Sequence, residues 1–261
     1  MQTRDVAEAW DANAEVWARH VRAGYDTYRD LYNNPAFFEF VGDVNGLTIL
    51  DAGCGEGYNT RLLARRGARM TGCDISPKLI TLAREEEARE PLGIGYEVVS
   101  MGDLSPFDDA SLNAVFSTMA LMDCDCYDEA MRQFWRVLHP GGMLAFSIVH
   151  PCFSYRNTLG WERDSEGEIV GIRLGDYFQP GPYEETWRFG AAPVSEEVRP
   201  FTIVYSNRTL TETLNPILGA GFLLDSISEP RPSLEACEKA GGLRKHRLIP
   251  GTLLVKARKP K

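Results

Sequence analysis

The chain has 261 residues, of which 44% are hydrophobic and 25% charged, and its formal net charge is −9 at pH 7. These values are typical of a globular protein, and the acidic balance disfavours a partner that presents a phosphate backbone. The longest basic run, 244–247, is expected to be a solvated loop. No apolar run approaches the roughly 18 residues of a membrane span, and the N-terminus lacks the apolar core of a signal peptide. We therefore expect a cytoplasmic monomer or homodimer with a small-molecule partner, and no contact with nucleic acid or membrane.

Helices are expected before residue 47. Apolar residues recur every three or four positions over 5–22, which predicts an amphipathic helix that ends at Gly24. Tyr25 and Tyr28 continue the helical spacing, and a short apolar helix follows at 36–41.

Strands and helices alternate from residue 47 to 149. The expected strands are 47–51, 69–74, 96–100, 112–117 and 143–149, and the expected helices are 60–66, 77–89 and 126–137. This alternation requires crossover connections and predicts a parallel sheet. An irregular stretch is expected at 151–208, then a helix at 209–218, a strand at 222–228, a loop at 230–250 and a last strand at 252–257.

The segment Leu50-Asp51-Ala52-Gly53-Cys54-Gly55-Glu56-Gly57 joins the first strand of this alternation to its helix. A glycine-rich turn between strand and helix lets the backbone approach a cofactor, because glycine tolerates positive φ and has no Cβ. The acid at Asp51 would repel the pyrophosphate of a dinucleotide. It suits a ligand that bears an ammonium and a sulfonium, which favours S-adenosyl-L-methionine over NAD.

The turn and the alternation together resemble the class I S-adenosylmethionine-dependent methyltransferases, and in particular the small-molecule enzymes of ubiquinone and menaquinone biosynthesis. The turn matches the family's L-D-x-G-C-G-x-G motif at every position, and the resemblance covers about 47–150 and 209–257. It implies a Rossmann-like α/β fold, with a doubly wound, seven-stranded, mostly parallel sheet whose last strand is antiparallel. It also implies S-adenosyl-L-methionine as cofactor and S-adenosyl-L-homocysteine as product, with cofactor contacts from Asp51, Gly53, Cys54, Gly55 and Gly57.

Two further acids follow the ends of successive strands. Asp74 could accept hydrogen bonds from both ribose hydroxyls, and the resemblance implies this role for it, with Ile75 on the adenine face. The alternative for Asp74 is a helix-capping side chain. The resemblance implies that Asp103 binds the adenine amino group, with Gly102 and Leu104 beside it, and the alternative is an ordinary turn aspartate.

The loop after the fourth strand, 117–123, is expected to line the cofactor through Met119 and the acceptor through Met122. It lacks the N/D-P-P-Y/F motif that family members acting on adenine or glutamine nitrogens carry. Asp123 and Asp125 resemble part of the metal site of catechol methyltransferases, but the Asp and Asn ligands that such a site needs at the fifth strand are absent. No metal is therefore expected.

His150 follows the fifth strand, at the sheet edge that faces the ligand in open parallel sheets. We consider it a candidate catalytic base for a hydroxyl or ring carbon. The alternative is a structural histidine before a proline.

Eight aromatic residues lie at 1–46 and ten at 151–208, together two thirds of the total. We expect an N-terminal helical lid at 1–46, a cofactor-binding core at 47–150 and 209–261, and an inserted substrate cap at 151–208. The alternative is that the aromatic residues form a satellite core of their own. Tyr25, Tyr28 and Arg29 are the N-terminal candidates for substrate contact.

The expected activity is methyl transfer to the O, N or C atom of a small, aromatic or hydrophobic acceptor. One alternative is a nicotinamide-dependent oxidoreductase, which Asp51 and the glycine spacing disfavour. Another is a protein that binds S-adenosylmethionine without catalysis.

Overall fold

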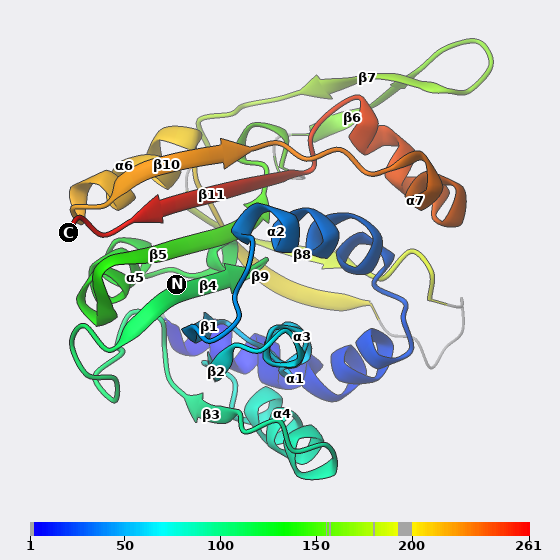
Figure 1. Ribbon diagram of the computed structural model, residues 1–261. Coiled ribbons are helices and arrows are strands. Elements are labelled where there is room, and N and C mark those ends of the chain that lie inside the picture. The colour runs from blue at the N-terminus through cyan, green and yellow to red at the C-terminus, as the bar shows by residue number, and fades with distance from the viewer. Residues whose placement is uncertain (1–2, 155, 157, 180, 193–199) are drawn as a thin grey trace.

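The computed structural model describes residues 3–154, 156, 158–179, 181–192 and 200–261 (Figure 1). Its centre is a seven-stranded sheet in the order β10-β11-β5-β4-β1-β2-β3. The strands are β1 (Thr48–Ala52), β2 (Arg69–Asp74), β3 (Gly95–Val98), β4 (Leu112–Thr118), β5 (Leu138–Val149), β10 (Leu223–Ser228) and β11 (Thr252–Arg258). β11 is antiparallel to both of its neighbours, and the other pairs of this sheet are parallel. The predicted fold class is confirmed.

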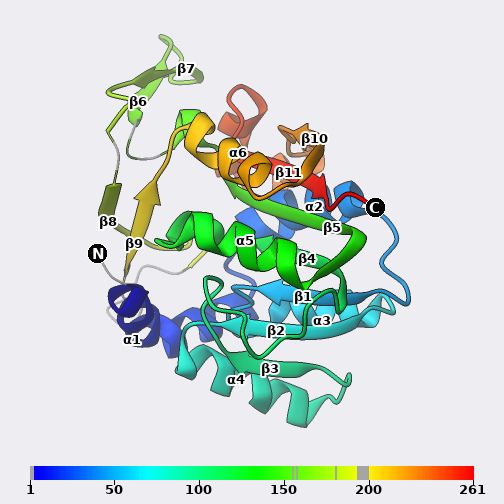
Figure 2. The same ribbon diagram turned by 90° about the vertical axis from the view of Figure 1, so that its left-hand side faces the viewer.

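Helices cover both faces of the sheet (Figure 2). α2 (Asn34–Val41), α3 (Tyr58–Arg65) and α4 (Pro77–Arg89) pack on one face, and α5 (Tyr127–Val137) and α6 (Leu210–Gly219) on the other. Ile49 and Leu50 are both fully buried, on opposite faces, because the central strands have helices on either side.

The helix after β2 begins as the sequence predicts. The Ser76 hydroxyl accepts a hydrogen bond from the backbone N of Leu79 at 3.2 Å, and Pro77 is the first helical residue. This N-cap fixes the position at which β2 delivers Asp74 to the sheet edge.

The expectation that 151–208 is irregular is wrong. The segment contains two antiparallel hairpins, β6 (Thr158–Arg163) with β7 (Ile169–Leu174) and β8 (Gly181–Trp187) with β9 (Phe201–Asn207). Prolines and glycines near the strands mask a period-two pattern, in which alternate residues of β9 are buried. Tyr155, one of the ten aromatic residues of this segment, lies outside the described residues.

The expected loop at 230–250 also contains structure, namely α7 (Leu234–Lys239) and a 3-10 helix (Gly241–Arg247). The basic run in it is not simply solvated, because His246 is buried. No helix among the described residues is long and apolar enough to cross a membrane.

At one end of the sheet, α1 (Thr3–Arg22) lies against β9 and α4 (Figure 2). The chain then passes through a π-helical turn (Arg29–Asn33) into α2. These N-terminal elements and the β8–β9 hairpin come together where β1, β2 and β4 end.

Candidate active site

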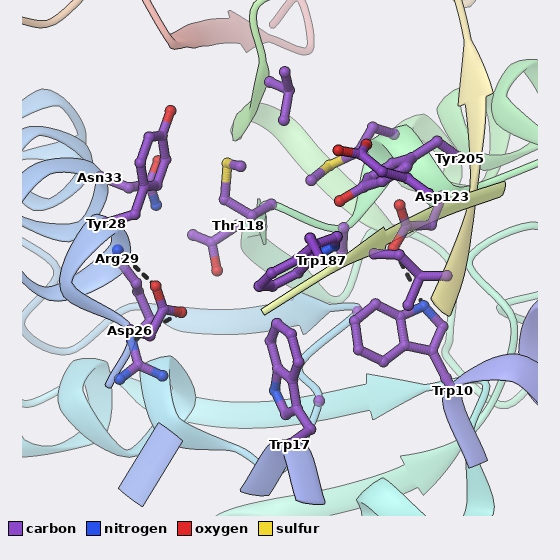
Figure 3. A pocket seen from close by; sticks show the side chains of 18 of the residues that line it. Trp10, Trp17, Asp26, Tyr28, Arg29, Asn33, Thr118, Asp123, Trp187 and Tyr205 are labelled. Atoms are coloured by element: carbon purple, nitrogen blue, oxygen red, sulfur yellow. Dashed lines mark hydrogen bonds and ion pairs between the residues drawn. The ribbon is translucent and has the colours of Figure 1, made fainter. Parts of the chain in front are cut away.

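A cavity of about 420 Å³ lies between the strand ends, the N-terminal segment and the β8–β9 hairpin (Figure 3). This volume falls within the range of small-molecule sites. The residues that line it include Trp10, Trp17, Tyr25, Tyr28, Arg29, Asn33, Gly53, Cys54, Gly55, Asp74, Ile75, Met101, Thr118, Met119, Met122, Asp123, Glu185, Trp187, Tyr205, Lys245 and His246.

The glycine turn forms one wall, and at Gly53 it has no room for a side chain. A Cβ on Gly53, where φ is +77°, would lie 2.4 Å from the Cβ of Ala120. Gly53, Cys54 and Gly55 line the cavity, whereas Gly57 begins α3 from a left-handed conformation behind the wall. The turn therefore offers bare backbone to a ligand, as the motif predicts.

Asp51 lies beneath this turn rather than in the cavity wall. Its Oδ2 accepts a hydrogen bond from the Thr60 hydroxyl at 2.6 Å, while its Oδ1 has no partner among the described residues. Burial raises the pKa of the Asp51 carboxyl to about 6, against a lowering by the Thr60 bond, and nearby Asp74 adds to the rise. A buried carboxyl just below the turn favours a cationic group above it.

Asp74 reaches the cavity and also holds the turn. Its Oδ2 accepts from the backbone N of Gly55 and its Oδ1 from the backbone N of Ser76, each at 2.9 Å. Burial raises the pKa of this carboxyl, and the backbone hydrogen bonds partly offset the rise. Since a carboxylate offers about four acceptor positions, Asp74 can hold the turn and still accept from a ligand's hydroxyls. Ile75 lines the cavity beside it.

Three predicted cofactor residues do not line the cavity, namely Gly102, Asp103 and Leu104. Asp103 is exposed and accepts from the backbone N of Ser105 at 3.1 Å, and Leu104 is fully buried in the core. Met101 from the same loop lines the cavity in their place. The proposed adenine contact of Asp103 stays a prediction that this geometry does not support.

The loop after β4 contributes Met119, Met122 and Asp123 to the wall. Asp123 is 4% exposed, and its Oδ2 accepts a hydrogen bond from Nε1 of Trp10 at 3.2 Å (Figure 3). Its Oδ1 is buried and has no partner in the described part of the chain. Burial raises the pKa of this carboxyl well above its usual range, and the Trp10 bond acts in the opposite direction.

The structure does not bring His150 into the cavity wall. Its Nδ1 accepts from the backbone N of Cys152 at 3.2 Å, so that Nε2 carries the proton and donates to Glu229 at 2.7 Å. Burial lowers the pKa of His150, although Glu229 raises it. Both ring nitrogens are engaged, which favours the structural alternative over a base.

The predicted N-terminal contacts all reach the cavity. Tyr25, Tyr28 and Arg29 line it, and Figure 3 shows Tyr28 and Arg29. The Arg29 guanidinium lies 3.7 Å from the ring centre of Tyr58 and bonds Asp30 at 2.8 Å. Its buried Nη2 has no partner within the described ranges, which leaves a donor for a ligand.

Aromatic rings of the lid and the cap meet across the cavity. Trp17 contacts Trp10 and Trp187, with ring centres 5.0 and 5.7 Å apart. The rings of Phe189 and Phe201 pack behind them in a small cluster. The aromatic residues thus form a small cluster of their own and also line the cavity, and the lid and cap roles stay predictions.

Sequence reasoning missed several ionisable lining residues, among them Glu185, Lys245 and His246. The ammonium of Lys245 lies 5.1 Å from the ring centre of Trp161, and burial lowers its pKa. His246 stacks on Tyr32, and burial lowers its pKa to about 4. The alternation of large residues at 183, 185 and 187 is a sequence signal that could have identified Glu185. The residues around His246 give no comparable signal. Among the described residues, no group of three or more His, Cys, Asp or Glu could hold a metal ion.

Comparison with known proteins finds relatives of this chain. Residues 50–146 match the model of a methyltransferase domain. The chain is 34% identical over 106 residues to malonyl-[acyl-carrier protein] O-methyltransferase of Serratia marcescens, covering 40% of this chain and 39% of that protein. It is 35% identical over 124 residues to demethylmenaquinone methyltransferase of Tropheryma whipplei, covering 47% of this chain and 51% of that protein. The chain thus spans about half the length, or less, of these two curated relatives.

The fold comparison covers more of the chain. The crystal structure of an S-adenosylmethionine-dependent methyltransferase from Mesorhizobium loti matches with a TM-score of 0.69 and 29% sequence identity. The match covers 86% of this chain and 96% of that one. It therefore extends well beyond the methyltransferase domain matched at 50–146.

Proposed function

Because the chain belongs to the class I S-adenosylmethionine-dependent methyltransferases, we propose that it methylates a small, aromatic or hydrophobic acceptor held between the N-terminal helices and the β8–β9 hairpin. The observation that carries this proposal is the continuity of the cavity. The glycine turn and Asp74 line the same cavity as the rings of Trp17 and Trp187. A donor site and an apolar acceptor site thus adjoin.

The residues present fit the methyl donor. The Gly53–Gly55 backbone leaves space that a Cβ would fill, Asp74 offers free acceptor positions to ribose hydroxyls, and the unpaired Nη2 of Arg29 suits a carboxylate. The bound donor would supply a methyl group already activated by the sulfonium. We infer that the chain's own contribution is to orient the two reactants and exclude water.

The lid and the cap exclude water from the cavity. Rings from α1 and β8 meet directly, as at Trp17 and Trp187, and cover the cavity with apolar surface. Such a wall suits a small, aromatic or hydrophobic acceptor. Domain roles at 1–46 and 151–208 are part of this proposal.

Calorimetry with S-adenosyl-L-homocysteine tests the donor site. Asp74→Ala should weaken binding at least tenfold, about 1.4 kcal/mol, because the ribose acceptors are lost. Ser76→Ala is the matched control: it removes the helix cap, costing about 1 kcal/mol of stability, but retains the carboxylate. Equal affinity of wild type and Asp74→Ala would refute the ribose role, and nicotinamide absorbance from a co-purified cofactor would overturn the methyltransferase proposal.

A further inference from the structure

Over residues 183–187 of β8 and 201–205 of β9, the inward face of the hairpin is apolar or aromatic except at one position. Residues 183, 185 and 187 of β8 pair with 205, 203 and 201 of β9. Tyr183 stacks on Tyr205, and the ring of Trp187 lies 5.5 Å from that of Phe201. Between them, opposite Ile203, the sequence places the carboxyl of Glu185.

Glu185 has no partner for one of its oxygens. Its Oε2 is buried and accepts no hydrogen bond from any described residue, while the side chain lines the cavity. Burial raises the pKa of the Glu185 carboxyl to about 7. A carboxyl on an apolar face without a partner destabilises the fold, which points to a partner that arrives with the ligand.

Asp123 supplies a second, independent oxygen of this kind. It belongs to the 3-10 helix Leu121–Asp123, which contacts β9. Its Oδ1 is unpaired within the described chain although the residue is more than nine-tenths buried. Two acceptor oxygens on separate elements therefore face one cavity.

Indole rings surround the same space. Trp10, Trp17 and Trp187 line it, and indole faces attract cations more strongly than the faces of other aromatic rings. Two of the cavity's own cations have contacts away from the Glu185 carboxyl. Arg29 bonds Asp30, and Lys245 lies over Trp161.

We propose that the methyl acceptor is an amine, whose nitrogen binds the Glu185 carboxyl in the ring-lined part of the cavity and gives its proton to it. This inference rests on the proposed methyl transfer. An ammonium group has several N–H donors and a positive charge, which match two unpaired carboxyl oxygens and the indole faces. A phenol has one donor, and a carboxylate acceptor would be repelled by both acids.

In the proposed reaction, the ammonium first transfers one proton to the Glu185 carboxylate and becomes a neutral amine with a free electron pair. That pair forms the new N–C bond while the C–S bond of the sulfonium breaks, and the electrons of the broken bond stay on sulfur. The products are a methylated ammonium and the neutral thioether, and Glu185 then releases the proton to solvent.

Three ligands that differ only in their polar group provide the test, namely 2-phenylethylamine, 2-phenylethanol and phenylacetate. Each is titrated by calorimetry into the full chain saturated with S-adenosyl-L-homocysteine. The amine should bind at least tenfold more tightly than the other two. Glu185→Gln should reduce amine affinity at least tenfold, about 1.4 kcal/mol, and leave the alcohol within twofold.

Glu184→Gln is the matched control, because Glu184 is the preceding residue of β8 and faces outward. It removes the same charge and should leave amine affinity unchanged. Three results would each overturn the inference: no binding of the amine, equal affinity for the amine and the alcohol, or equal effects of the two substitutions. Failure of the wild type to bind S-adenosyl-L-homocysteine would instead overturn the proposed function, so the two failures are distinguishable.

Discussion

Trp10 and Asp123, 113 positions apart in the chain, are joined by a hydrogen bond of 3.2 Å from Nε1 to Oδ2 (Figure 3). The bond connects the N-terminal helix to the loop after β4 in the wall of the cavity. Because Asp123 is almost fully buried, water can replace Trp10 as its hydrogen-bond partner only if α1 moves away. The pair therefore holds α1 over the cavity.

Trp10→Phe should loosen that contact while conserving most of the ring. The lost bond is worth about 1 kcal/mol, so S-adenosyl-L-homocysteine should bind roughly fivefold more weakly and dissociate faster. Stopped-flow fluorescence measures the dissociation rate. Trp135→Phe, on the partly exposed surface of α5, is the control and should leave the rate unchanged. Identical rates for both variants would contradict the role of the bond.

Substitution of His150 should affect stability more than catalysis. His150→Asn removes the bond to Glu229 and should cost about 1–2 kcal/mol of unfolding free energy, with transfer of a labelled methyl group within threefold of wild type. Glu229→Ala removes the same bond from the other side and should have a similar cost. A hundredfold loss of transfer in a folded His150→Asn would restore the base role predicted from the sequence.

Affinity for the methyl donor should rise with pH. The pKa of Asp51 is raised to about 6, so this carboxyl is neutral below that pH and negative above it, and the pKa of Asp74 is shifted in the same direction. The negative form attracts the sulfonium, and binding of S-adenosyl-L-methionine should therefore strengthen between pH 5 and 7.5. S-adenosyl-L-homocysteine lacks that charge and should show a shallower dependence by calorimetry. Parallel pH profiles would exclude an electrostatic role for the two acids.

Glu185 should lower stability at neutral and alkaline pH. Its pKa in the folded chain is raised to about 7 from 4.5, so the folded state holds the proton more tightly and loses stability as pH rises between these values. Glu185→Gln should thus be about 1–2 kcal/mol more stable than wild type at pH 8, after allowance for partial solvent screening, and equal to it at pH 4.5. Thermal unfolding at both pH values measures the difference. Glu184→Gln should match wild type, and a destabilised Glu185→Gln at pH 8 would contradict the argument.

Local chemistry explains which parts of this molecule the sequence predicts well. The predicted strand 69–74 matches β2, and the start of α4 follows from Ser76 and Pro77. The glycine turn likewise carries its own conformational requirement. Such features depend on residues that are close neighbours along the chain.

The rest depends on contacts between distant segments. His150 is engaged by Glu229, 79 positions away, and no local pattern foretells that pairing. The segment around Asp103 has the composition of a binding loop. In the structure, however, Met101 lines the cavity and Asp103 does not. The hairpins at 158–207 were missed because prolines and glycines obscured their alternation.

In the described part of the chain, the β6–β7 and β8–β9 hairpins each form a separate two-stranded sheet and share no ladder with the central one. They enter after β5 and return to α6, so the sheet retains all its pairings whichever hairpins stand there. We therefore expect that exchange of this insertion with that of a relative would change the lining of the cavity and leave the pairings of the central sheet intact. The scaffold is in this sense modular.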